Sequence, residues 1–159
     1  MQFACGQGVM QDKRMNMYME QATCTCGNIS AEILLTCDLS SYIPRECDCD
    51  FCTKYVAAYI SDPAGKLDIK IVNSDQTATY MQGDNLAKLL VCTKCDVLVS
   101  VTYTENRKTF GALNSKTLEN QEQLSISQRA SPKLLSSTEK KKRWREIWFS
   151  DVTIGANSA

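Results

Sequence analysis

Histidine is absent from the 159-residue chain. Its absence excludes several kinds of site: Ser-His and Cys-His catalytic pairs, histidine general bases, and zinc sites with mixed cysteine and histidine ligands. Any catalysis by this protein must therefore use thiolate, carboxylate, lysine, tyrosine or a bound metal ion.

Long apolar runs and an excess of charge of one sign are absent as well. No apolar run approaches the roughly 18 residues of a membrane-spanning helix, and residues 1–20 lack the apolar stretch of a signal peptide. Eighteen basic residues balance eighteen acidic ones, so the chain has no general attraction for nucleic acid or anionic membranes. We expect a cytoplasmic protein with neither nucleic acid nor membrane as a partner.

The body of the chain shows the alternating pattern of half-buried β-strands. Apolar residues alternate from Ile29 to Cys37, from Leu67 to Ile71 and from Val97 to Tyr103. Residues 77–81, 88–91 and 108–113 are weaker strand candidates, and the connections are short. The length fits one domain, so we predict an irregular N-terminal segment over residues 1–20 and a single, mainly β domain over residues 21–159.

A short helix is predicted near the C-terminus, after a polar connection over residues 119–135. Ser136 and Glu139 have the spacing of a capping box, and Trp144, Ile147 and Trp148 follow at helical spacing. We expect the tryptophans to pack on the β core. We expect the basic run over residues 140–143 to form the solvated face of this helix.

Nine cysteines are the most informative feature of the composition. In a reducing compartment such a number indicates metal binding more often than disulfides. Seven of them fall into three closely spaced clusters, from which two or three thiolates can reach one metal ion; zinc binds thiolate sulfur at about 2.3 Å in tetrahedral geometry. The clusters are Cys24/Cys26, Cys47/Cys49/Cys52 and Cys92/Cys95.

The number of cysteines in each cluster suggests a division into two sites. The first and third clusters together supply four thiolates, enough for a closed structural site, whereas the middle cluster supplies three and leaves a fourth position open for a substrate. Neighbouring strands that begin after Cys26 and Cys95 would bring the outer clusters together. Other pairings remain open, for example of the middle cluster with Cys24 or Cys37, as does a redox role for the paired cysteines.

The order of these cysteines resembles the glutathione-dependent formaldehyde-activating enzyme family, which includes centromere protein V. The similarity covers roughly residues 22–120: Cys24-Thr25-Cys26-Gly27, then Cys47-x-Cys49-x-x-Cys52, then Cys92-x-x-Cys95, with weaker support from Phe110–Asn114 and Thr117–Glu119. Asp96 stands where the family usually has glycine, and aspartate tolerates the left-handed backbone that such a turn needs.

The resemblance implies an Mss4-like fold of zinc-stapled antiparallel β-sheets with two Zn²⁺ ions per chain. It implies a structural zinc and a catalytic one, whose ligands are respectively Cys24, Cys26, Cys92 and Cys95, and Cys47, Cys49 and Cys52. The implied partners are a small thiol such as glutathione and an aldehyde, and a homodimer is left open.

Two functions of different classes follow as hypotheses. The first is a zinc-dependent carbon–sulfur lyase, resembling S-(hydroxymethyl)glutathione synthase, that acts on an aldehyde–thiol adduct at the three-cysteine site. The alternative is a non-enzymatic, zinc-stapled protein-binding module that uses the Trp144/Trp148 helix or a sheet face. A weaker third hypothesis is zinc buffering or redox sensing by exposed thiolates.

Overall fold

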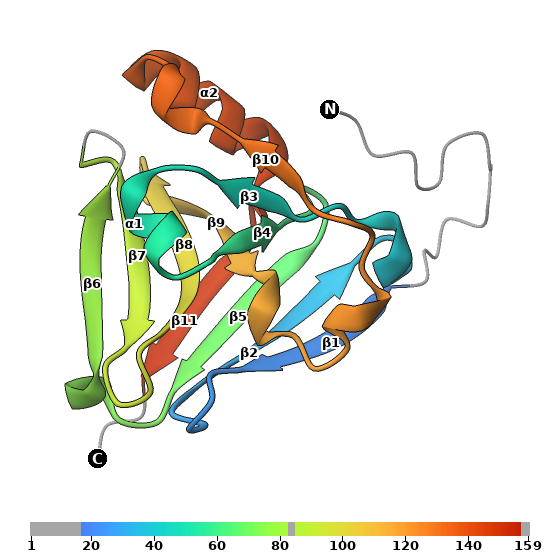
Figure 1. Ribbon diagram of the computed structural model, residues 1–159, viewed down its shortest axis with the longest axis vertical. Helices are drawn as coiled ribbons and strands as arrows, with labels where there is room; N and C mark the ends of the chain where they lie inside the picture. The colour runs from blue at the N-terminus through green and yellow to red at the C-terminus, as the bar shows by residue number, and fades with distance from the viewer. Residues whose placement is uncertain (1–16, 83–84, 157–159) are drawn as a thin grey trace.

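The computed structural model describes residues 17–82 and 85–156 (Figure 1). Two β-sheets and one C-terminal helix of three turns make up most of the described chain, which confirms the mainly β fold with a short C-terminal helix. Among these residues no helix is long and apolar enough to cross a bilayer.

Eleven strands, two α-helices and five short 3-10 helices follow one another along the described residues. The first part contains β1 (Tyr18–Thr23), β2 (Ile29–Leu35), β3 (Arg45–Cys47), α1 (Asp50–Lys54), β4 (Ala58–Ile60) and β5 (Lys66–Ile71). The second part contains β6 (Thr77–Gln82), β7 (Ala87–Cys92), β8 (Val97–Glu105), β9 (Lys108–Asn114), β10 (Gln128–Ala130), α2 (Ser137–Ile147) and β11 (Val152–Ala156).

The strands form a four-stranded sheet in the order β1-β2-β5-β11 and a seven-stranded sheet in the order β10-β3-β4-β9-β8-β7-β6. All pairs are antiparallel except β11 with β5 and β10 with β3, which are parallel. Both parallel strands lie at sheet edges and come late in the chain, so they close each sheet with segments distant in sequence.

Sequence patterns explain the central strands. In β2 and β5 every second residue is buried, as the alternation predicts. The hairpin between β8 and β9 turns through Asn106 and Arg107, both with positive φ (53° and 67°). Two consecutive residues with positive φ give a tight turn whose twist matches that of the flanking strands.

The seven-stranded sheet separates two cores. Residues on one face, such as Leu90 and Val99, pack against β2 and β5 of the four-stranded sheet. Residues on the other face, such as Leu89 and Val101, pack with α1 and α2. The fold therefore has three layers, with the larger sheet in the middle.

Helix α2 docks on the outer face of the larger sheet through its aromatic residues. The predicted capping box is present: the Ser136 hydroxyl accepts from the Glu139 backbone N–H, and the Glu139 carboxylate accepts from the Ser136 N–H. Trp144 and Trp148 are buried and stack with a centroid distance of 4.8 Å. After the helix, two backbone hydrogen bonds join Phe149 to Gly111 of β9, which fixes the helix end on the sheet.

Several elements differ from the sequence-based expectations. The expected irregular segment over residues 1–20 ends too late, because β1 begins at Tyr18 and pairs with β2; residues 1–16, including Cys5, lie outside the described residues. Strands β3, β10 and β11 and helix α1 are also unpredicted. The three strands have three to five residues and no regular burial alternation, so local periodicity gives no signal for them.

A buried carboxylate anchors the turn between β4 and β5. Asp62 is 4% exposed, and its Oδ2 accepts from the Tyr42 hydroxyl at 2.6 Å and from the Thr36 hydroxyl and backbone N–H at 2.7 and 2.9 Å. Its Oδ1 accepts from the Ala64 N–H at 3.0 Å. Burial, followed by the hydrogen bond to Asp62, raises the pKa of Tyr42 well above its ordinary value, so this hydroxyl remains a donor at neutral pH.

Replacing Asp62 by asparagine is expected to destabilise the protein by roughly 2–4 kcal/mol, because an amide NH₂ replaces one of the two acceptor oxygens among converging donors. Asp75→Asn is the matched control, since Asp75 is exposed and its change is expected to cost under about 0.5 kcal/mol. Urea unfolding of both variants measures the difference. Equal stability of the two variants would contradict the anchoring role of Asp62.

Candidate metal centres and cavity

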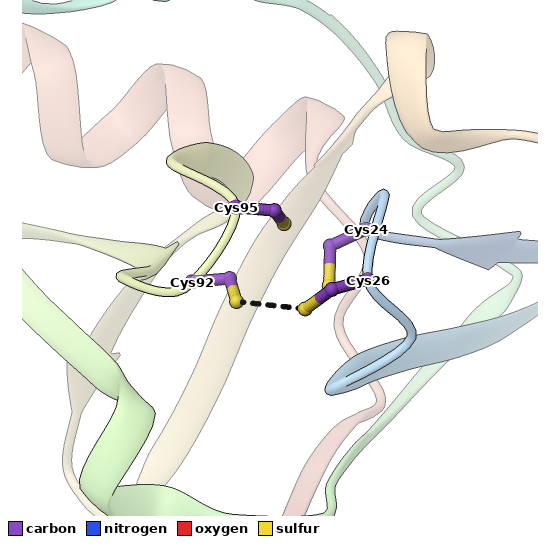
Figure 2. Close-up of side chains that lie close together, drawn as sticks. All are labelled: Cys24, Cys26, Cys92 and Cys95. Carbon is purple, nitrogen blue, oxygen red and sulfur yellow. Dashed lines mark hydrogen bonds between the residues drawn. The ribbon is translucent and has the colours of Figure 1, made fainter.

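The turns β1–β2 and β7–β8 bring four cysteines together. Cys24 and Cys26 follow β1, Cys92 ends β7 and Cys95 precedes β8, and their sulfurs all lie within 4.8 Å of one another (Figure 2). The Cys24–Cys26 and Cys26–Cys92 sulfur distances are 3.8 and 3.6 Å. A tetrahedron with zinc–sulfur bonds of 2.3 Å has edges of about 3.8 Å, so this group fits a zinc ion.

Local backbone geometry shapes both turns. Gly27 has a φ of 85° and Asp96 a φ of 58°, so each cysteine pair is followed by a residue with left-handed backbone. The expectation that Asp96 tolerates this conformation is confirmed. The Cys24 sulfur also accepts from the Ile29 N–H at 3.3 Å, a contact that stabilises a thiolate.

The four cysteines connect the two sheets. Cys24 and Cys26 belong to a turn of the four-stranded sheet and Cys92 and Cys95 to a turn of the seven-stranded sheet. The predicted pairing of these clusters is confirmed, but the expectation that neighbouring strands of one sheet produce it is wrong. A metal ion here would link the sheets across the inner core, to which Cys24 and Cys92 belong.

Hydrogen bonding favours a thiolate in this group. Burial alone would raise the pKa of Cys92, but the N–H groups of Cys95 and Lys94 and the Cys26 thiol donate to it and lower the pKa to about 7. Burial and the neighbouring thiols raise the pKa of Cys95 to about 12. A cation is what would allow the remaining thiols to ionise together.

The middle cluster forms a separate group on the opposite side of the larger sheet. Cys47 ends β3, Cys49 caps the N-terminus of α1, and Cys52 lies in its first turns, so that the three sulfurs lie within 4.8 Å of one another. The Cys49 sulfur accepts from the Cys52 N–H at 3.4 Å. Among the described residues, no fourth Cys, Asp or Glu side chain joins this group. The alternative pairings with Cys24 or Cys37 are therefore not formed.

The three thiols share one favoured negative charge. Hydrogen bonds from the Cys47 and Cys52 thiols lower the pKa of Cys49 to about 2. The hydrogen bond with Cys49 raises the pKa of Cys47 to about 11, and hydrogen bonds with Cys47 and Cys49 raise the pKa of Cys52 far above its ordinary value. Burial, followed by the charge of Cys52, raises the pKa of Tyr59 well above its ordinary value. The Tyr59 hydroxyl, 3.3 Å from the Cys52 sulfur, therefore stays protonated and can donate to a Cys52 thiolate.

The middle cluster opens into a cavity of about 320 Å³, within the usual size range of small-molecule sites. The seven-stranded sheet supplies Leu89 and Val101 to its wall, and one face of α2 covers it. That face consists of Lys140, Arg143, Trp144, Ile147 and Trp148, spaced as one side of a helix requires. Figure 1 shows α2 on the same side of the molecule as β3 and α1.

The basic residues of α2 do not form a uniformly solvated face, contrary to the prediction. Lys140 is 6% exposed, and together with Arg143 it lines the cavity. Lys140 lies four residues before Trp144 and Arg143 four residues before Ile147, and this helical spacing is the signal that could have placed them on the apolar face. Their charge led to the prediction of a solvated face, whereas the helix period places them at the cavity that the middle cluster also lines.

Aspartates between the cysteines lie outside the cavity wall. Asp50 is exposed, whereas Asp48 is half-buried and accepts from the Ser131 hydroxyl through Oδ2, while its Oδ1 is buried without a hydrogen-bond partner among the described residues. No Asp or Glu lines the cavity among the described residues.

The aromatic face of α2 does not serve as an exposed docking surface. Trp144 and Trp148 are each 6% exposed and face the cavity, so the protein-binding alternative loses this helix face as its site.

Comparison with known proteins places the chain in no family. No protein-family model matches it, and no curated protein matches it. A solved structure of a Rhodobacter sphaeroides protein from the Northeast Structural Genomics programme is 22% identical, with coverage of 63% of this chain and 88% of that chain and a TM-score of 0.48. A likeness at this level carries no functional argument.

Proposed function

We propose that this chain is a zinc-dependent carbon–sulfur lyase that acts on an adduct of an aldehyde and a small thiol, with S-hydroxymethylglutathione as the first candidate substrate. One observation carries the proposal: three thiols converge at the wall of a cavity where, among the described residues, no fourth protein ligand completes the set. A closed structural site has four ligands, whereas a catalytic zinc keeps one position for substrate.

The seven clustered cysteines divide into two roles under this proposal. Cys24, Cys26, Cys92 and Cys95 would hold a structural zinc between the sheets, and Cys47, Cys49 and Cys52 a catalytic zinc at the cavity. Bound there, zinc would accept the substrate sulfur and stabilise it as a thiolate near neutral pH. All seven clustered thiols are free and so available to a metal ion. The order of the cysteines along the chain, which resembles formaldehyde-activating enzymes, supports the same assignment.

In the lyase direction the carbon–sulfur bond of the hemithioacetal breaks. The hydroxyl loses its proton as the aldehyde carbonyl forms, and the sulfur leaves as a thiolate that later takes up a proton. Residues of the chain would assist by position: Tyr59 holds the Cys52 sulfur through its hydroxyl, as outer partners of metal ligands do. Trp144 and Trp148 would exclude water from the adduct.

The proposal is tested on the wild-type protein purified under reducing conditions. Elemental analysis is expected to give two zinc ions per chain, one for each cysteine group. Exchange of ¹³C-formaldehyde with its glutathione adduct, followed by NMR exchange spectroscopy, is expected to accelerate at least ~10-fold over the uncatalysed rate. One zinc per chain, or two without any acceleration, would overturn the lyase assignment.

A further inference from the structure

We propose that Arg45, Lys140 and Arg143 form an anion subsite in the cavity, and that this subsite selects thiol substrates that carry carboxylate groups. The inference rests on the proposed function for the reaction, but the subsite is defined by residues other than the metal ligands. The inference names a class of substrate and assigns its selection to basic residues of β3 and α2.

The cavity concentrates positive charge in a chain whose net charge is zero. Four basic residues line it, Arg45 from β3, Lys133 from the segment before α2, and Lys140 and Arg143 from α2, and no Asp or Glu lines it among the described residues. A catalytic zinc would not neutralise this charge, because three thiolates and one divalent ion leave only one negative charge.

Ion pairs on α2 distinguish its outer side from its cavity side. On the outer side, Arg145 pairs with Glu105 at 3.0 Å and Lys142 lies 3.9 Å from Glu146. By contrast, within the described part of the chain neither Arg143 nor Arg45 forms a salt bridge with a carboxylate. Arg45 donates to the Ser61 hydroxyl at 2.7 Å, and that hydroxyl donates to the Ile147 carbonyl.

Two guanidinium groups on one small cavity repel each other. Arginine stays charged at neutral pH, and a partly buried cation without a counter-ion is costly to the folded protein. A ligand carboxylate would offset that cost with paired N–H···O bonds, because the guanidinium fork matches carboxylate geometry. The arrangement therefore fits an anion that arrives with the ligand.

The remaining walls indicate the rest of the ligand. Leu89, Val101, Trp144 and Trp148 are apolar and line the same cavity as the cysteines and the cations. A thiol with a short aliphatic body and one or two carboxylates would place sulfur at the cysteines, methylene groups on the tryptophans and carboxylate at the arginines.

Binding of succinate tests the subsite without any turnover. Both tryptophans of the chain line the cavity, so their fluorescence reports on its occupancy. We expect succinate to change the emission saturably and its neutral analogue succinamide to leave it unchanged. Arg143→Gln is expected to weaken succinate binding at least ~10-fold, as loss of a charge-assisted pair should. Lys142→Gln, which removes the same charge from the outer side of the helix, should change it less than ~2-fold.

Several results would overturn the subsite. They are absence of saturable succinate binding by a folded wild-type protein, equal binding of succinamide, or equal effects of Arg143→Gln and Lys142→Gln at unchanged melting temperatures. Tighter competition by inorganic phosphate would overturn the carboxylate assignment in favour of a phosphate ligand.

A second measurement separates the subsite from the lyase. If the lyase acts equally on the formaldehyde adducts of mercaptosuccinate and of neutral 2-mercaptoethanol, the selectivity is wrong while the lyase stands. If no lyase activity is found but succinate binding depends on Arg143, the subsite stands and the reaction is wrong.

Discussion

Replacing Cys92 by serine is expected to remove one zinc ion from the chain and to lower the melting temperature by more than ~10 °C. The Cys92 side chain is fully buried, and its sulfur lies 3.6 Å from that of Cys26 across the gap between the two sheets. Loss of this ligand disconnects the sheets and leaves three thiols crowded at the edge of the inner core. Loss of a structural metal is among the few changes that cost more than about 4 kcal/mol.

The measurement combines elemental analysis with thermal unfolding of the zinc-loaded protein. Cys52→Ser is the matched control, because it makes the same substitution in the other group. Its melting temperature is expected to fall by less than half as much, since the middle cluster lies on the outer face of the larger sheet and connects only β3 with α1. A Cys92→Ser protein that keeps both zinc ions, or melts within ~2 °C of wild type, would refute the structural role of this group.

Cysteine spacing predicted the three clusters, because ligands two or three positions apart can reach a common point from a tight turn, but it left open which clusters share a site. Spacing could not predict that the two groups lie on opposite faces of one sheet. That arrangement depends on the side to which Cys92 and Cys52 point, and hence on strand pairings between residues far apart in the chain. The strands that follow the two turns, β2 and β8, were predicted from alternation, but their assignment to different sheets was not.

For the basic residues of α2, by contrast, the sequence held the information that the prediction needed. The i,i+4 spacing of Lys140 to Trp144 and of Arg143 to Ile147 contained the needed signal, but composition outweighed it in the prediction of a solvated face. Arg143 lines the cavity without an ion pair from the described residues, which fits a counter-charge brought by the ligand of the proposed subsite. Local rules fail in this way at functional sites more than elsewhere, and under the proposed function Arg143, which lines the same cavity as the three cysteines, is the clearest instance.

Cys52→Ser is expected to abolish lyase activity, with a loss of roughly 10²–10³-fold, while the fold and one zinc ion persist. Serine is a poor zinc ligand at neutral pH because its hydroxyl stays protonated, so two thiolates are left to hold the ion. Cys52 also connects the cluster to Tyr59 at 3.3 Å, and such outer contacts typically contribute 10- to 100-fold to metal affinity or activity. The loss of activity should therefore follow the loss of one zinc.

Activity, zinc content and melting temperature measured on one sample of Cys52→Ser separate catalysis from folding. The expected pattern is one zinc per chain, a melting temperature near that of wild type, and aldehyde–thiol exchange at the uncatalysed rate. A variant with one zinc and full activity would show that the reaction does not need the middle cluster. A variant with two zinc ions and no activity would make Cys52 essential for a reason other than holding the metal, and would contradict the role proposed here for its thiolate.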